Sequence, residues 1–124
     1  MRTENIQFFT DKEEEFVDQL VRSGIPKKVA MALVFLTSTK ETTSREIEHG
    51  ADMRQSEVSQ AIKVLTTRGW IKSREDASAE KGRPVKIYTL AMPISKILGA
   101  IEKEKKEEIK QQLALLGKMK DYIQ

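Results

Sequence analysis

The stretch that decides the fold is residues 55–90, QSEVSQAIKVLTTRGWIKSREDASAEKGRPVKIYTL. Its first part, 55–68, has the periodicity of an amphipathic helix, and Gly69 supplies a stop signal directly after it. The apolar stripe is Val58, Ala61, Ile62 and Leu65. The opposite side carries Gln55, Ser56, Ser59, Gln60 and Lys63. We therefore predict a helix whose outer face is small, amide-bearing and basic.

Two short strand patterns follow this helix and flank a polar, basic loop. The first begins at Trp70-Ile71, the loop contains Gly82-Arg83-Pro84, and the second runs from Val85 to Leu90. The loop is longer than a two-residue turn. The pattern predicts a two-stranded ribbon, which is marginal alone and needs a helix to cover it.

Three further helices are predicted upstream, over 11–22, 26–39 and 44–50. Thr43-Ser44-Arg45-Glu46 matches a capping box at the start of the third, and we expect Gly24 and Gly50 to end the first and third. Four residues, 51–54, then lead into the helix at 55. A short helix, a tight turn and a second amphipathic helix make a helix-turn-helix.

From Ile94 the chain reads as one long helix of roughly thirty residues, about 45 Å at 1.5 Å per residue. Seven charged residues, 102–108, interrupt its apolar stripe, which then recurs every seven residues with the spacing of a short coiled coil. A second copy of the chain is the simplest partner. The predicted dimerisation residues are Ile94, Leu98, Ile101, Ile109, Leu113, Leu116 and Ile123.

The predicted fold class is mainly α with a small two-stranded β-wing, in the order α-α-α-α-β-β-α. This is a winged helix-turn-helix with a long C-terminal dimerisation helix. We expect a winged helix-turn-helix domain over 1–92 and a dimerisation element over 93–124.

Composition excludes several classes of function. The 124 residues include no cysteine and one histidine, so disulfides, thiolate chemistry and a metal site have no support. No nucleotide-binding loop or pocket-forming carboxylate pair is present. We therefore expect no catalytic residues, no metal and no cofactor: the chain is not an enzyme. It has no membrane-span or signal-peptide pattern, and a cytoplasmic location is expected.

The distribution of charge singles out the same segment. The formal net charge is only +3, but residues 53–90 hold eight basic and four acidic side chains, whereas residues 1–52 hold seven and ten. Ser, Gln and Lys on a helix can pair with base edges in a major groove, and a loop arginine suits a narrow minor groove. We therefore predict that the chain contacts double-stranded DNA. The helix residues are Arg54, Gln55, Ser56, Ser59, Gln60 and Lys63, and the wing residues are Lys72, Arg74, Lys81, Arg83 and Lys86.

Residues 25–90, with Gly69-Trp70-Ile71 and the wing sequence from Gly82 to Leu90, resemble prokaryotic winged-helix transcriptional regulators of the archaeal TrmB-like or MarR-like kind. The resemblance implies a recognition helix in the major groove, a wing arginine in the minor groove, and a dimer built by helices outside the winged helix. Arg54 departs from the pattern, because a Ser, Thr or Asp usually caps the recognition helix. Either the helix begins one turn sooner or Arg54 is free to contact phosphate.

Alternatives stay open at this point. The same scaffold can dock another protein, with the basic wing incidental. Glu57 sits at the edge of the polar face or accepts from a cytosine amino group. Trp70 and Tyr88 are expected to pack rather than stack on bases, and so few aromatics give no platform for single strands.

Overall fold

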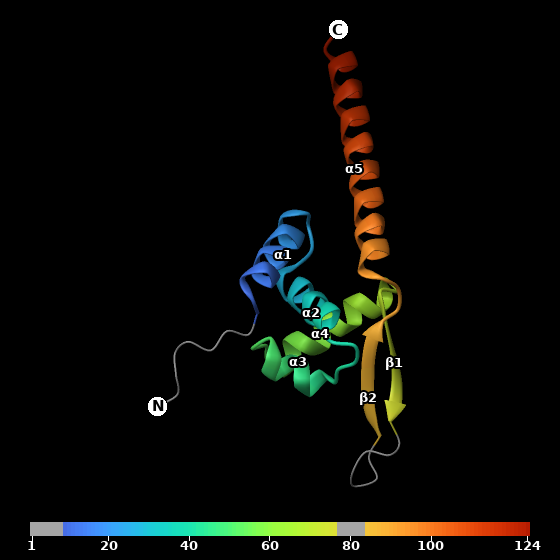
Figure 1. Ribbon diagram of the computed structural model, residues 1–124. Helices are drawn as coiled ribbons and strands as arrows, with labels where there is room; N and C mark the ends of the chain where they lie inside the picture. Colours follow the sequence, from blue (N-terminus) through green and yellow to red (C-terminus); the bar gives the residue numbers. More distant parts are fainter. Residues whose placement is uncertain (1–8, 77–83) are drawn as a thin grey trace. The chain divides into compact units, whose positions relative to one another are not determined.

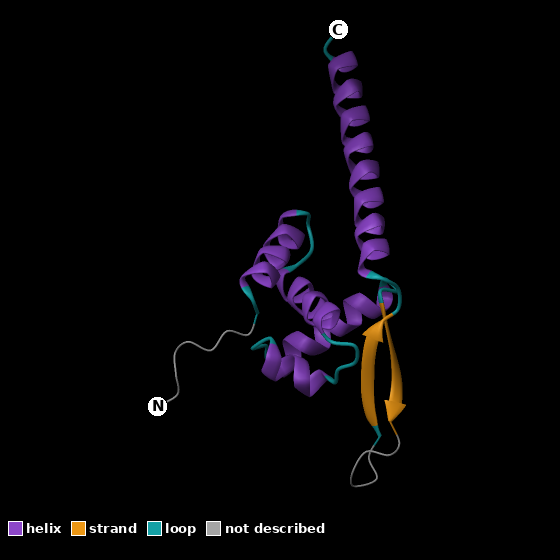
Figure 2. Cartoon of the chain, in the orientation of Figure 1, coloured by secondary structure: helices purple, strands orange, loops and turns teal. Residues whose placement is uncertain are grey.

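The structure is a computed structural model that describes residues 9–76 and 84–124. The chain divides into two compact units, 1–92 and 93–124. Figures 1 and 2 show the elements in the predicted order, four helices, two strands and a last long helix. The predicted fold class is therefore confirmed.

The first unit holds α1 (Asp11–Arg22), α2 (Lys27–Ser38), α3 (Ser44–Gly50) and α4 (Gln55–Thr67). Its core lies between the helices, and α2 is the central one, because both α1 and α4 pack on it (Figure 1). Apolar residues recur on more than one side of α2, which is why a single helix can be covered from several directions. Its buried residues are Val29, Ala30, Ala32, Leu33, Val34 and Leu36.

Local signals in the sequence account for the helix ends. Thr10 and Thr43 open α1 and α3 with capping boxes, in which the threonine oxygen accepts from the N–H of Glu13 or Glu46. Gly24 and Gly69 close α1 and α4 with positive φ angles of 109° and 78°. Glycine adopts a positive φ without a steric penalty because it has no Cβ.

The end of α3 is where the sequence predicts it, but its backbone differs from the ends of α1 and α4. The helix stops at Gly50, but the left-handed residue is Asp52, with a φ of 54°. Gly50 instead leaves space for Phe35: a Cβ there would lie 2.3 Å from Cε1 of that ring, so a larger residue would need the ring to shift. The turn closes when the N–H of Met53 donates to the carbonyl of Glu48 at 3.0 Å. This tight closure fixes where α4 starts.

The wing is an antiparallel pair, β1 (Ile71–Asp76) and β2 (Val85–Leu90), paired from Ile71 opposite Leu90 to Asp76 opposite Val85. Trp70 was predicted to start the first strand, but β1 begins one residue later, at Ile71. The N–H of Trp70 donates to the carbonyl of Leu65 and completes the end of α4. Its ring is buried, at 3% exposed, which agrees with a packing role.

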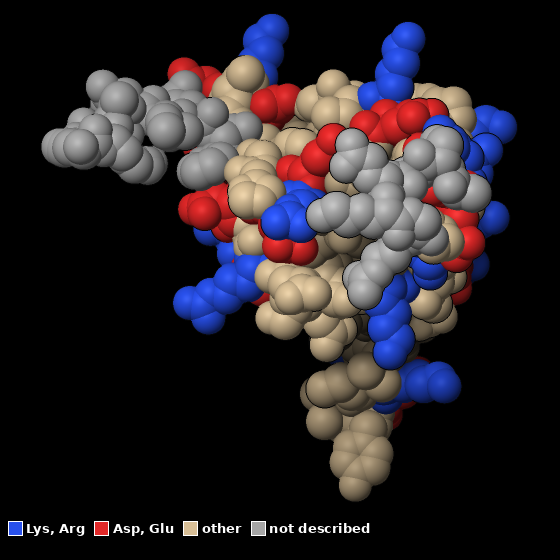
Figure 3. Space-filling model, turned by 90° about the horizontal axis from the view of Figure 1, so that it is seen from below, with Lys and Arg blue, Asp and Glu red and all other residues tan. Residues whose placement is uncertain are grey.

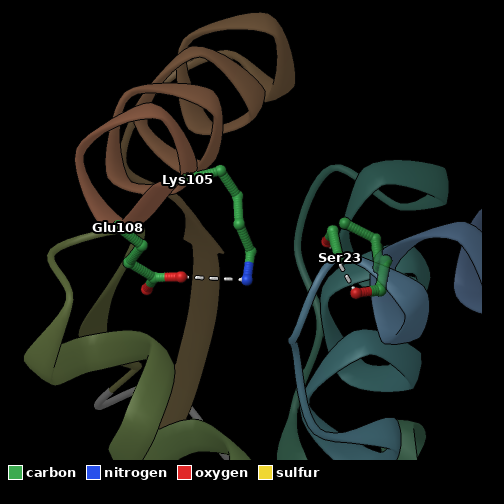
Figure 4. Close-up of polar contacts among 4 residues, drawn as sticks. Ser23, Lys105 and Glu108 are labelled. Atoms are coloured by element: carbon green, nitrogen blue, oxygen red, sulfur yellow. Dashed lines mark hydrogen bonds and ion pairs between the residues drawn. The ribbon is translucent and has the colours of Figure 1, made fainter. Parts of the chain in front are cut away.

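The second unit is α5 (Ile94–Tyr122), one uninterrupted helix as predicted. Its own charged residues pair along the helix surface. Figure 4 shows one such pair, in which Lys105 Nζ lies 3.1 Å from a carboxylate oxygen of Glu108. The same figure shows the Ser23 hydroxyl donating to the Leu20 carbonyl at the end of α1. Among the described residues, no helix is long and apolar enough to cross a membrane.

Candidate nucleic-acid interface

The polar face of α4 is presented to solvent. Its five predicted members line one shallow depression on the helix surface and are all exposed: Gln55, Ser56, Ser59, Gln60 and Lys63. Within the part of the chain that the structure describes, none of their side chains makes a hydrogen bond or ion pair. Their donors and acceptors are therefore available to an external partner.

The opposite face of α4 anchors the helix. Val58, Ala61 and Leu65 are buried to 1% exposure or less, and α4 packs on both α2 and α3. The apolar stripe therefore fixes the rotation of the helix about its axis. Because Ser59, Gln60 and Lys63 lie between these anchors in sequence, burial of the stripe is what turns them outward.

Glu57 holds the start of α4 rather than joining its polar face. Its carboxylate accepts the backbone N–H of Arg54 at 2.9 Å and lies 3.6 Å from the ammonium of Lys28 on α2. The Arg54 hydrogen bond first, and then the nearby positive charges of Lys28 and Arg54, lower the pKa of Glu57. Because this carboxylate already contacts Arg54 and Lys28, the geometry favours a place at the edge of the polar face. It disfavours contact with a cytosine amino group.

Arg54 stands just before the helix and is exposed. Of the two alternatives for Arg54, an earlier start of α4 is ruled out, because the backbone of Arg54 is extended and helical geometry starts at Gln55 as predicted. The guanidinium cannot act as an acceptor for the helix N–H groups, and Glu57 takes over part of the capping. The Arg54 side chain is thus exposed at the start of the helix, beside the positive end of the helix dipole.

The described wing cations lie on two faces of the ribbon. Lys72 and Arg74 are two residues apart in β1 and share one face, whereas Lys86 pairs opposite Glu75 on the other. Arg74 also contacts Glu41, with its Nη2 3.0 Å from the carboxylate and both side chains more than half exposed. Lys81 and Arg83 lie outside the described residues.

One link between the wing and the helices was not predicted. Thr42 forms an isolated antiparallel bridge to Tyr88, with backbone hydrogen bonds of 3.1 and 2.7 Å. Its buried hydroxyl donates to Glu46 of α3 at 3.0 Å. The bridge fastens β2 to the segment before α3. A single bridge residue has no alternation, so the only available signal was the β-propensity of threonine.

The charged side chains are mixed rather than segregated on the face shown in Figure 3. Lys and Arg appear there next to Asp and Glu over the visible, described part. Ion pairs also join residues 53–90 to other segments: Arg74 pairs with Glu41, and Glu57 pairs with Lys28. The first of these offsets one positive charge of residues 53–90 with an acid from another segment.

The predicted dimerisation residues of α5 fall into two groups. Ile101 is buried and Ile94 is half-buried, whereas the remaining five are exposed: Leu98, Ile109, Leu113, Leu116 and Ile123. Three more large apolar residues of the same half are exposed and were not predicted as contacts: Leu115, Met119 and Tyr122. Leu115 and Tyr122 lie beside the period-seven stripe, whereas Met119 falls on it at position d.

No family model matches this sequence, and no similar protein is found among curated proteins. Solved structures do match. TrmBL2, an archaeal chromatin protein, has a TM-score of 0.71 and 16% identity over 90% of this chain and 40% of its own. A possible transcriptional regulator from Methanosarcina mazei Go1 has a TM-score of 0.60 and 15% identity over 81% and 85%.

A third structure, S. aureus MepR in complex with DNA, has a TM-score of 0.51 and 21% identity over 91% of this chain and 93% of that one. This chain spans less than half the length of TrmBL2. At these identities the likeness concerns the fold. The chain has the winged helix-turn-helix fold of TrmB-like and MarR-like transcription regulators.

Proposed function

We propose that this chain is a transcriptional regulator that binds double-stranded DNA sequence-specifically as a homodimer. The observation that carries the proposal is the polar face of α4. Its Ser, Gln and Lys side chains are exposed and make no hydrogen bond or ion pair within the described part of the chain, while the other face is fixed in the core. The likeness in fold to MepR, solved with DNA, and to TrmBL2, described by its mode of DNA binding, supports the proposal.

In the proposed mechanism α4 enters the major groove, and its side chains have different roles. Ser59 and Gln60, near the middle of the helix, offer the hydroxyl and amide groups that discriminate base edges. Arg54 and Lys63 supply charge to phosphates, which contributes affinity without sequence preference. Lys72 and Arg74 on one face of the wing, together with Arg83 in its loop, extend the contact along the backbone or into the minor groove.

Two copies would place two recognition helices in successive major grooves, about 34 Å apart. The apolar stripe of α5 that contains Leu113 and Leu116 is the proposed dimer contact. Its exposed aliphatic side chains have no cover within the described part of the chain. Homodimer symmetry then predicts a binding site with two related halves.

The test is a salt titration of duplex binding by the full-length protein. We expect log Kd to rise linearly with log salt, with a slope of about 0.9 for each phosphate neutralised. A Lys63→Ala variant should lower that slope by roughly one contact, whereas Lys12→Ala on α1 is the matched control and should leave it unchanged. Absence of duplex binding even at low salt would overturn the proposal and favour docking of a protein.

A further inference from the structure

The C-terminal half of α5 exposes two apolar stripes rather than one. The first, the predicted seam, is Ile109, Leu113, Leu116 and Ile123. The second stripe is Leu115, Met119 and Tyr122. Every one of these side chains is at least 51% exposed, and Tyr122 reaches 90%. Isolated exposed apolar residues are ordinary, but seven within fifteen positions form a continuous patch.

The two stripes point in different directions. Each residue of an α-helix advances by about 100° around the axis, so Leu115 and Leu116 are separated by roughly that angle. Met119 and Tyr122 follow Leu115 at steps of four and three, which keeps them on its side. Together the two stripes occupy about half of the circumference, whereas the seam of a two-stranded coiled coil is narrower.

Heptad positions make the same point. With Ile109, Leu116 and Ile123 at position a, Leu115 and Tyr122 fall at position g, outside the a/d seam. Met119 falls at position d, within the seam, and Leu113 falls at position e beside it. In two-stranded coiled coils g positions commonly carry Glu or Lys, which stay in water beside the seam. Here they carry a leucine and a tyrosine. Four-helix bundles bury a wider stripe of this kind.

A two-helix contact would also be short. The apolar repeat runs only from 109 to 123, about two heptads, because residues 102–108 are all charged. A sustained coiled coil takes three to four heptads. The seven side chains expose on the order of 100 Å² each, or roughly 700 Å² per helix, close to the ~800 Å² per partner of a standard interface. A single neighbour would cover about half of that surface.

We propose that four copies of this chain associate through the C-terminal halves of α5 into a four-helix bundle. The predicted seam contacts one neighbouring α5, and the second stripe contacts the other. The same chain is the occupant because the repeat on α5 is self-complementary. The other eight positions between 109 and 123 are polar or small. Six of them leave one side of the helix suited to water: Lys110, Gln111, Ala114, Gly117, Lys118 and Asp121. Gln112 and Lys120 fall among the apolar positions, one between the two stripes and one within the first.

The bundle has a consequence that rests on the proposed function. Four chains carry four copies of α4, and one duplex engages two of them. The tetramer therefore holds two duplex segments at once, whereas a dimer holds one.

The first experiment measures the mass of the full-length chain without DNA, by light scattering and sedimentation at 10–100 µM. We expect four times the chain mass of 14.2 kDa. Leu115→Lys should reduce this mass to that of two chains, because it charges the second stripe and spares the predicted seam. Ala114→Lys, on the polar side of the same turn, is the matched control and should keep four chains.

A wild-type mass of two chains or one would overturn the bundle, as would a Leu115→Lys variant that keeps four. Helical circular dichroism checks that both variants fold.

A second measurement adds an immobilised duplex and a labelled free duplex. The wild type should capture the labelled duplex, whereas Leu115→Lys should not. A four-chain particle that binds no duplex would refute the proposed function but support the bundle. A two-chain particle that binds duplex would refute the bundle but support DNA binding.

Discussion

Helix α4 and the C-terminal half of α5 both carry apolar residues at helical spacing. In α4 the polar face is exposed to water, whereas in α5 the apolar residues are exposed. In α4 the apolar residues Val58, Ala61 and Leu65 are buried and the polar face is exposed. In α5 the apolar residues from Ile109 onward are exposed. A polar helix face in water is stable by itself, whereas an exposed apolar stripe favours association. The proposals made for the two helices follow this difference: a polyanion is the proposed partner of α4, and further copies of the chain are the proposed partners of α5.

The largest effect is expected where α4 is anchored. Leu65 is fully buried, so Leu65→Ala removes packing and leaves a cavity, at a cost of about 2–5 kcal/mol in the free energy of unfolding. Urea denaturation measures the change, with the exposed Thr66→Ala as control. A loss below 0.5 kcal/mol would mean that α4 is not held by this stripe.

A charge on the predicted seam of α5 should break the seam contact without unfolding the first unit. Leu116→Glu replaces apolar burial worth about 2–3 kcal/mol per side chain with a carboxylate that must stay in water. We expect a mass of no more than two chains by sedimentation, at concentrations where the wild type forms the four-chain bundle. An unchanged sedimentation coefficient would show that α5 does not form the contact.

The wing loop should contribute less than either helix. Arg83→Ala is expected to weaken duplex binding by about 1 kcal/mol, most strongly on A·T-rich duplexes with narrow minor grooves, while thermal stability is unchanged. Binding competition between A·T-rich and G·C-rich duplexes measures it. Equal affinities of wild type and variant for both would remove Arg83 from the interface.

The smallest effect concerns pH. The folded-state pKa of Glu57 is lowered, chiefly by the Arg54 N–H, so its ionised form stabilises the fold at neutral pH. That contribution is present above the ordinary glutamate pKa, about 4.3, and is lost as the pH falls through the lowered value. Glu57→Gln should therefore reduce the Tm at pH 7 and match the wild type near pH 2, with Glu15→Gln as control. A Tm difference that is the same at both pH values would contradict this role.

Periodicity and capping signals predicted the helices well because they are local. The stripe of 55–68, the Thr43 capping box and Gly69 each act within a few residues, and their elements appear in the structure with close bounds. The end of α3 was predicted correctly for the wrong reason. Gly50 makes room for Phe35, which lies fifteen residues earlier, and no local pattern encodes that contact.

Long-range pairings explain what else the sequence did not show. The bridge between Thr42 and Tyr88 and the ion pair between Glu41 and Arg74 each join residues more than thirty positions apart. The role of Glu57 likewise depends on Lys28 of another helix. The base-reading roles of Ser59 and Gln60 remain a prediction, since their exposure makes them available but does not select a base.

The most direct test is selection of bound sequences from a random pool of duplexes, run in parallel with the wild type and Gln60→Ala. The account predicts one enriched motif with two related halves for the wild type, and relaxed preference at one position of each half for the variant. Each lost amide–base contact should cost about 1–3 kcal/mol of discrimination. No enriched motif with the wild type, or the same motif with unaltered preference in the variant, would contradict a reading role for the polar face of α4.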